Sequence, residues 1–162
     1  MNETRPLWAP WRIDFIRGAK ESRCFLCGKK DDFSSPDEEM MVYRGDTAFV
    51  ILNRFPYNSG HLLVAPYRHI GDIAALDEAE QGELMRLTIR AKQTLERLMQ
   101  PQGYNIGFNL GQSAGAGVAD HIHLHIVPRW NGDTNFMPVI GGTRVVPEAL
   151  IQTVQMIRDH WR

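Results

Sequence analysis

Three histidines at alternating positions form the part of the sequence with the clearest potential for chemistry. His121, His123 and His125 are separated by single branched apolar residues in the segment HIHLHIV. Because side chains alternate between the two faces of a β-strand, an extended chain here predicts three imidazoles on one face. A strand that served only the core would have no use for adjacent imidazoles, which lose their charge when they are desolvated. The pattern therefore indicates a site for metal, phosphate or nucleophilic chemistry.

The central histidine is the natural nucleophile of this group. A neutral imidazole attacks phosphorus readily near neutral pH because its pKa lies close to that pH. His123 has a histidine on each side, and it could attack an α-phosphate and carry the nucleotidyl group. His125 projects from the same face and can donate hydrogen bonds to phosphate oxygens or to the leaving group. This scheme requires no metal at the reacting centre.

A glycine-rich loop, GQSAGAG at residues 111–117, leads into the histidine segment. Glycines allow the backbone to turn several N–H groups toward one point, and such a nest binds phosphate oxygens. A plain hairpin connection is the default interpretation of a loop of this kind taken alone. Its position beside the histidines favours the phosphate-binding interpretation.

A second group of reactive side chains begins with Cys24 and Cys27, which form a Cys-x-x-Cys pair. Such a pair suits a redox site or half of a zinc site, and two buried cysteines without a metal are the plainer alternative. The redox form usually opens a helix in a parallel-sheet fold, which this sequence does not predict. A zinc ion would need two further ligands, for which the candidates are His61, His69 and His121.

Hydrophobic periodicity and turn signals predict the elements that position these side chains. The expected strands lie at 40–44, 47–52, 61–65, 104–110 and from 121 to about 128. A long helix is expected to begin at Asp77, which forms a capping box with Glu80, and to end before Pro101. A final helix is expected from about Pro147. Because the strands come in neighbouring groups, their order indicates an α+β fold with a mainly antiparallel sheet.

Length and composition indicate one globular domain. The chain has 162 residues, 43% of them hydrophobic and 23% charged, and a net charge of −1. We expect a single domain over 1–162, with an N-terminal arm at 1–23, a core at 24–130 and a C-terminal loop and helix at 131–162. The near-neutral charge offers no basic field, so no nucleic-acid partner is expected. No signal peptide or membrane-length apolar run is recognised, so we expect a cytoplasmic location without a membrane partner and without a structural disulfide.

Two segments together resemble the histidine triad (HIT) superfamily. HIHLHIV fits the family pattern His-x-His-x-His followed by apolar residues, and FVILNRFPYNSGHLLVAPYRHI, at 49–70, is similar to the family's other characteristic segment. The resemblance runs from about Cys24 to Trp130. The segments LWAPWR, CFLC, NLGQSAGAG and VPRW are most similar to the bacterial diadenosine tetraphosphate phosphorylase branch, near the fragile histidine triad hydrolases.

The resemblance implies a fold and a set of catalytic roles. The fold would be the small α+β HIT fold, a five-stranded, mainly antiparallel sheet with one long helix and a C-terminal helix, in a homodimer whose sheets join edge to edge. His123 would be the nucleophile and His125 would contact phosphate. His61 would support the histidine cluster, to which His121 also belongs; taken alone, His61 would be interpreted as a satisfied core histidine.

The resemblance also implies contacts to a nucleotide. Asn53 holds the family's ribose-binding position, eight residues before His61, with a turn residue as the alternative. Asn109 fits the phosphate-contacting amide before the glycine-rich loop. Ile51 and Phe25 are candidates for an apolar adenine pocket, with ordinary core packing as the alternative.

A structural zinc is the third implication. Several members of the superfamily bind zinc through a Cys-x-x-Cys pair, a histidine after the second strand of the characteristic segment and the first triad histidine. Cys24, Cys27, His69 and His121 match that arrangement. The ion would tie the N-terminal segment to the sheet and fix the orientation of His121 rather than polarise substrate. No organic cofactor is expected.

One departure from the family pattern bears on the phosphate contacts. Many members carry a Gln-Ser or Gln-Thr pair shortly before the triad, where this chain has Gly117 followed by Val118. The backbone N–H groups of Gly115, Ala116 and Gly117, with the Ser113 hydroxyl, would have to contact the phosphate instead. This departure weakens the phosphoramidase alternative.

Together the motifs predict an enzyme acting on the α-phosphate of dinucleoside polyphosphates through a nucleotidyl-His123 intermediate, with phosphate or water as the acceptor. Its partner would be a small-molecule nucleotide substrate. An adenosine 5′-phosphoramidate hydrolase and a nucleotide-binding regulatory protein with little turnover are the alternatives.

Overall fold

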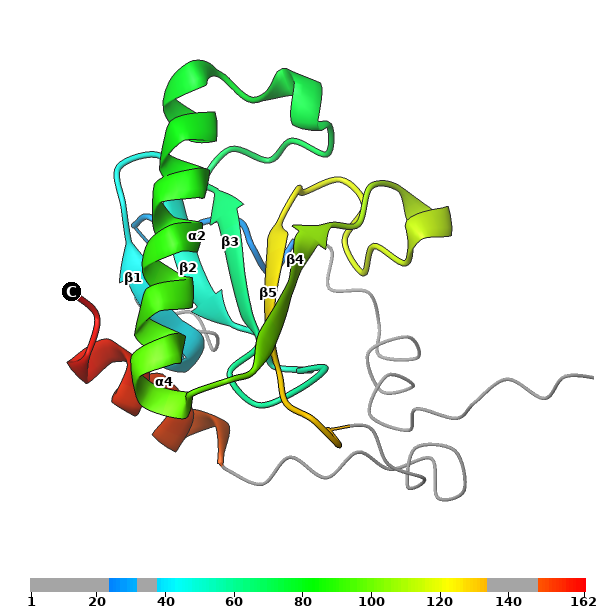
Figure 1. The fold of residues 1–162 in the computed structure, drawn as a ribbon. Coiled ribbons are helices and arrows are strands. Elements are labelled where there is room, and N and C mark those ends of the chain that lie inside the picture. The colour runs from blue at the N-terminus through cyan, green and yellow to red at the C-terminus, as the bar shows by residue number, and fades with distance from the viewer. Residues whose placement is uncertain (1–23, 32–37, 134–148) are drawn as a thin grey trace, which may run out of the picture.

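A computed structural model describes residues 24–31, 38–133 and 149–162. Five antiparallel strands form one sheet in the order β1-β2-β3-β5-β4 (Figure 1). The strands are β1 (Met41–Arg44), β2 (Ala48–Leu52), β3 (Leu62–Pro66), β4 (Gly103–Phe108) and β5 (Leu124–Arg129). The expected α+β fold with a five-stranded antiparallel sheet is confirmed.

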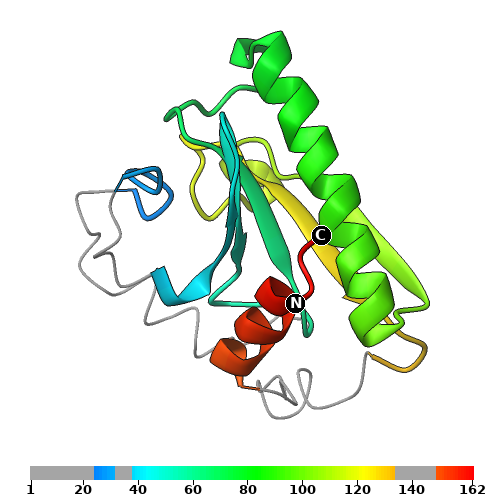
Figure 2. The same ribbon diagram turned by 90° about the vertical axis from the view of Figure 1, so that its left-hand side faces the viewer.

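The centre of the sheet is apolar on both faces. Every residue of β2 and of β3 is buried, so these two strands are enclosed from both sides. Helix α2 (Glu78–Met99) packs across β2, β3 and β5 on one face, and the segment 24–31 lies beyond the other face (Figure 2). The histidine site can therefore form on a face that the long helix does not cover.

Helix α2 begins where the sequence predicts it. The Asp77 side chain accepts a hydrogen bond from the Glu80 backbone N–H, and the Glu80 carboxylate accepts one from the Asp77 backbone N–H. This capping box satisfies N–H groups that have no partner within the helix. The helix ends at Met99, where Gln100 adopts a left-handed conformation ahead of Pro101.

The C-terminal helix begins later than expected. In the described part of the chain, α4 spans Leu150–Asp159 with Ala149 at its N-cap, three residues beyond the expected start at Pro147. Val154 and Ile157 are buried against the core, as the helical spacing predicts. Pro147 and the N-terminal arm at 1–23 lie outside the described residues. No described helix has the length and apolar character needed to cross a membrane.

The histidine strand is shorter than expected. Strand β5 begins at Leu124 rather than at His121, so the prediction that the strand includes the first two triad histidines was wrong. Its ladder with β3 stops at the pair Val64–Leu124. The cause lies in Pro66, the end of β3, which has no N–H to donate to a continuing ladder. The carbonyl of Pro66 instead accepts a hydrogen bond from the ring of His121.

Candidate active site and metal cluster

The ring of His123 is held in one orientation and one tautomer. Its Nδ1 lies 2.8 Å from the backbone oxygen of His121, and the side chain is 6% exposed. A carbonyl oxygen only accepts, so Nδ1 carries the proton and Nε2 keeps its lone pair. Burial lowers the pKa of His123 below its ordinary value, which keeps the ring neutral at pH 7. His123 therefore has the state that a nucleophile requires.

A chain of hydrogen bonds sets the opposite tautomer on His125. The backbone N–H of Tyr57 donates to Nδ1 of His61 over 3.0 Å, so the proton of a neutral His61 ring lies on Nε2. That Nε2 lies 2.9 Å from Nδ1 of His125 and donates to it. The proton of His125 is thereby placed on Nε2, where it can be donated outward. Burial, together with the neighbouring His123, lowers the pKa of His125 to about 4.

The two rings face each other in complementary states. The ring centroids of His123 and His125 are 4.9 Å apart, and the planes meet at 62°. His123 offers a lone pair and His125 offers an N–H. This arrangement can attack a phosphorus atom from one ring while the other donates to one of its oxygens.

The loop between β2 and β3 places a polar side chain against His61, the ring that donates to His125. The Asn53 side-chain oxygen accepts from the Phe55 backbone N–H, and its nitrogen lies 3.3 Å from Nδ1 of His61. The turn role that the sequence offered as the alternative for Asn53 is therefore present in the structure. The Asn109 side-chain nitrogen lies 3.4 Å from Nε2 of His125, and a half-turn of the amide presents its oxygen to the proton on that Nε2.

The next two residues are those that the sequence offered for an adenine pocket, Ile51 and Phe25. Ile51 pairs with Leu63, which pairs with His125, and directly paired residues of antiparallel strands share a face. Ile51 thus lies on the face of His125, but it is only 2% exposed and belongs to the hydrophobic core. Phe25 is partly buried against the same core. Core packing is therefore present at both positions that the sequence offered for an adenine pocket.

The glycine-rich loop forms a compact turn with exposed side chains. Gly115 adopts a φ of +82°, and its N–H donates to the Gln112 carbonyl over 2.9 Å. The N–H of Ala116 donates to the Gly111 carbonyl over 3.4 Å. In this conformation these two amides donate within the loop and close it.

The four expected zinc ligands lie together and are here called the metal cluster. The nearest donor atoms of Cys24, Cys27, His69 and His121 all lie within 4.8 Å of one another. Nδ1 of His121 is 3.5 Å from Cys24 Sγ and 3.6 Å from Cys27 Sγ, and Nδ1 of His69 is 3.1 Å from Cys27 Sγ. A tetrahedral zinc, with bonds of about 2.3 Å to sulfur and about 2.0 Å to nitrogen, separates its ligand atoms by about 3.5 Å. The donor set and its spacing fit a metal site.

The ring of His121 is oriented toward this cluster. Its Nε2 donates to the Pro66 carbonyl over 2.8 Å, which leaves the lone pair on Nδ1, facing the two sulfurs. Burial raises the pKa of the Cys24 thiol to about 11, so the thiol is protonated at pH 7 until a cation displaces its proton. His121 therefore contributes its ring to the metal cluster and its backbone oxygen to the tautomer of His123.

Sequence reasoning missed one residue of the site. The ring of Tyr57 lies 4.7 Å from that of His61 and 5.8 Å from that of His125, nearly parallel to the latter, and it is 40% exposed. A tyrosine in a turn-rich loop carries no periodic signal. Its position four residues before His61 was the available clue, because a single tight turn returns the chain to that ring.

The comparison with known families agrees with this geometry. Residues 35–132 match the family described as "HIT domain". The chain belongs to the HIT family. That match contains the whole sheet and both rings of the histidine pair.

Individual relatives extend the comparison over the full chain. The "AP-4-A phosphorylase" of Mycobacterium tuberculosis is 36% identical over 99% of this chain and 86% of its own length. The asymmetrical bis(5′-nucleosyl)-tetraphosphatase of Schizosaccharomyces pombe is 31% identical over 60% of this chain and 53% of its own length. A zinc-bound histidine triad family protein from Mycobacterium smegmatis has the same fold, with a TM-score of 0.62, 24% identity, and coverage of 75% of this chain and 83% of that one.

Proposed function

We propose that this HIT protein is an enzyme that cleaves dinucleoside polyphosphates, such as diadenosine tetraphosphate, at the α-phosphate. The observation that carries the proposal is the pair of locked tautomers, with a lone pair on Nε2 of His123 and a proton on Nε2 of His125. Relatives named for the phosphorolysis of diadenosine tetraphosphate and for the cleavage of bis-nucleosyl tetraphosphates support this substrate class.

In the first step, Nε2 of His123 attacks the phosphorus that bears adenosine. The N–P bond forms, the P–O bond to the rest of the polyphosphate breaks, and ATP leaves with that electron pair. The attacking ring of His123 becomes cationic, and its Nδ1–H already donates to the carbonyl of His121, which stabilises the positive charge. The Nε2–H of His125 donates to an oxygen of the phosphoryl group as negative charge develops there.

In the second step, an oxygen of inorganic phosphate attacks the same phosphorus atom. The P–N bond breaks, its electrons return to Nε2 of His123, and ADP leaves as the second product. Water in place of phosphate would give AMP. The relative named as a phosphorylase favours phosphate as the acceptor, so we propose phosphorolysis.

The nucleotide contacts in this proposal come from both sides of the histidine pair. Asn53 binds the ribose with the part of its amide that the turn leaves available, and Asn109 contacts the phosphate beside His125. Ser113, Gly115, Ala116 and Gly117 close over the polyphosphate after a rearrangement of the loop. Phe25, which is only partly buried, contacts the base, and Ile51 supports the face of His125 from within the core.

We further propose that the metal cluster holds a structural zinc. Two thiolates and two imidazoles are ligands that zinc prefers, and they come from three segments that are far apart in the sequence. The ion would fix the 24–31 segment to the segment that precedes β5. Metal analysis of protein purified without chelator should give about one zinc per chain.

The exposed strand β4 supports a homodimer. Within the described residues, β4 pairs only with β5, and its middle residues are exposed. An edge strand of this kind presents unpaired N–H and carbonyl groups to a second copy of the same strand. The two sheets would then join through β4.

Product analysis tests the proposed function. The protein is incubated with diadenosine tetraphosphate, with and without inorganic phosphate, and the nucleotides are separated. ADP and ATP that form only with phosphate support phosphorolysis, and AMP formed without phosphate would show a hydrolase instead. A higher kcat/KM for an adenosine 5′-phosphoramidate would favour the phosphoramidase. Tight nucleotide binding without any product would contradict an enzymatic role.

A further inference from the structure

One short segment supports the part of the chain that leads into β5 and carries His121 and His123. Between β3 and η2 (Ile73–Ala75), residues 66–71, here called the platform, contact the chain that leads into β5. The carbonyl of Pro66 accepts from the ring of His121 over 2.8 Å, and the carbonyl of Ile70 accepts from the N–H of Ile122 over 2.6 Å. The platform also carries His69, a member of the metal cluster.

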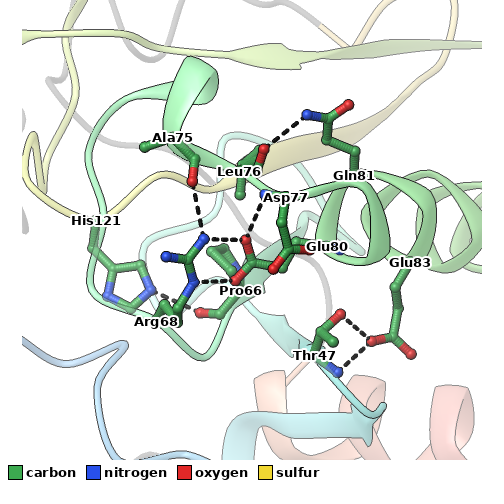
Figure 3. Close-up of polar contacts among 10 residues, drawn as sticks. All are labelled: Thr47, Pro66, Arg68, Ala75, Leu76, Asp77, Glu80, Gln81, Glu83 and His121. Carbon is green, nitrogen blue, oxygen red and sulfur yellow. Dashed lines mark hydrogen bonds and ion pairs between the residues drawn. The ribbon is translucent and has the colours of Figure 1, made fainter.

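The platform is tied to the first turn of α2 by an ion pair. Nε and one terminal nitrogen of Arg68 lie 2.6 Å and 2.5 Å from the two carboxylate oxygens of Glu80, and that same nitrogen donates to the Ala75 carbonyl (Figure 3). Glu80 is 3% exposed, and the guanidinium holds the pKa of its carboxyl below the ordinary value. A bidentate pair with one buried partner fixes geometry far better than an ordinary surface ion pair.

These contacts form a continuous path from the helix to the nucleophile. Glu80 holds Arg68, the neighbouring platform carbonyl of Pro66 orients His121, and the backbone oxygen of His121 sets the tautomer of His123. Figure 3 shows the ion pair, the Pro66 carbonyl and the His121 ring side by side. Arg68 and Pro66 are joined by the backbone through Tyr67, and the other links in this path are hydrogen bonds or an ion pair.

We propose that Arg68 and Glu80 are positioning residues of the active site, which hold the platform so that His69 and His121 bind the metal and His123 presents Nε2. The role in catalysis rests on the proposed function, whereas the roles in metal binding and in the tautomer do not. Neither residue touches substrate in this account.

The chain offers a matched control one turn further along the same helix. Glu83 is also a buried carboxylate, and it accepts from the backbone N–H groups of Asp46, Thr47 and Ala48. Figure 3 shows its contacts to Thr47. Burial alone would raise the pKa of Glu83, but these hydrogen bonds, with one from the Thr47 hydroxyl, outweigh it and lower the pKa. Glu83 supports the β1–β2 turn, and among the described residues its carboxylate has no hydrogen bond or ion pair to the platform.

The experiment compares Glu80→Gln with Glu83→Gln in the full chain. The midpoint of thermal unfolding reports stability, and competition with a chromophoric chelator reports zinc affinity. The ¹⁵N spectrum of His123 reports the tautomer of its ring. We expect both variants to lose stability. Only Glu80→Gln should lose zinc affinity, by about tenfold, as substitutions behind metal ligands do. Only Glu80→Gln should convert the His123 ring from one tautomer to a mixture.

A kinetic measurement and a milder variant complete the test. Glu80→Gln should lower kcat with little change in KM, because positioning acts on the reacting geometry rather than on substrate binding. The Arg68 side chain is 53% exposed, and Arg68→Lys keeps its charge but loses the bidentate geometry. The zinc affinity and the kcat of this variant should therefore lie between those of wild type and those of Glu80→Gln.

Two results would overturn the proposal. If Glu80→Gln and Glu83→Gln lowered zinc affinity equally, the effect would be one of general stability. If Glu80→Gln left zinc affinity and the His123 tautomer unchanged, the path from the helix to the histidines would carry no coupling. Both readouts need no substrate, so a failure of the proposed function, seen as no turnover of diadenosine tetraphosphate, is distinguishable from either result.

Discussion

At the scale of single residues, the site depends on histidines that are buried and neutral. His61, His121 and His123 are each less than 9% exposed, and each ring has a hydrogen-bonded partner that fixes its proton. A neutral imidazole can serve as nucleophile or as donor, depending on which nitrogen carries the proton. Residue identity alone does not distinguish His123 from His125; the carbonyl of His121 and the ring of His61 do.

The depressed pKa of His125 predicts a specific loss of stability in acid. Its pKa is about 4 in the folded protein and about 6.5 in the unfolded chain, so between these values the unfolded state binds more protons. The stability present above pH 6.5 is therefore lost as the pH falls toward 4. His125→Asn should reduce this loss, which thermal unfolding of both proteins from pH 7.5 to 4.5 would measure. If the unfolding temperatures of variant and wild type fell equally with pH, the loss would not come from the depressed pKa of His125.

At the scale of elements, the position of His121 depends on the close approach of two loops, the platform and the chain that precedes the triad. A Cβ added at Gly71 would lie 2.6 Å from the carbonyl oxygen of Ala119 and 3.0 Å from Cα of Asp120, both backbone atoms just before the triad. Only glycine allows the platform to come this near to the chain that leads into β5.

Gly71→Ala is therefore expected to displace His121 and to weaken zinc binding and turnover together. Gly82→Ala is the control, because a Cβ there meets only the flexible end of Arg86 within helix α2. That substitution should stabilise the protein by about 0.5–1 kcal/mol, as replacing glycine inside a helix does. Chelator competition and thermal unfolding measure both effects. Unchanged zinc affinity in Gly71→Ala would refute the close approach.

Local signals in the sequence predicted most helices and strands, and tertiary contacts explain where the observed elements differ from the predicted ones. Asp77 and Glu80 predicted the start of α2 correctly because a capping box is formed within four residues. The start of β5 was predicted three residues early, since the strand depends on Pro66 of its neighbour, which no local pattern around His121 reveals. The Cys-x-x-Cys pair indicated half of a zinc site by itself, but the full set with His69 and His121 was predicted through the family resemblance, because the four ligands are spread over nearly a hundred residues.

At the scale of the whole molecule, the position of β4 at the edge of the sheet predicts self-association. Ile106 is 47% exposed in the middle of that strand. Ile106→Lys should convert a dimer into monomers, because a charge at the interface is desolvated without a partner. Ile89→Lys is the matched control, since Ile89 is 51% exposed on α2, away from this edge. Sedimentation velocity distinguishes the two; a wild-type monomer would disprove the proposed dimer.

The central claim is that Nε2 of His123 forms a covalent bond to the α-phosphorus. The most direct measurement is intact-protein and peptide mass spectrometry after mixing with diadenosine tetraphosphate without phosphate, quenched in alkali to preserve the P–N bond. We expect one adenylyl group per chain on His123, lost when phosphate is added, absent from His123→Asn and retained by the exposed control His160→Asn. An adenylyl group on another residue, or turnover of His123→Asn at the wild-type rate, would contradict it.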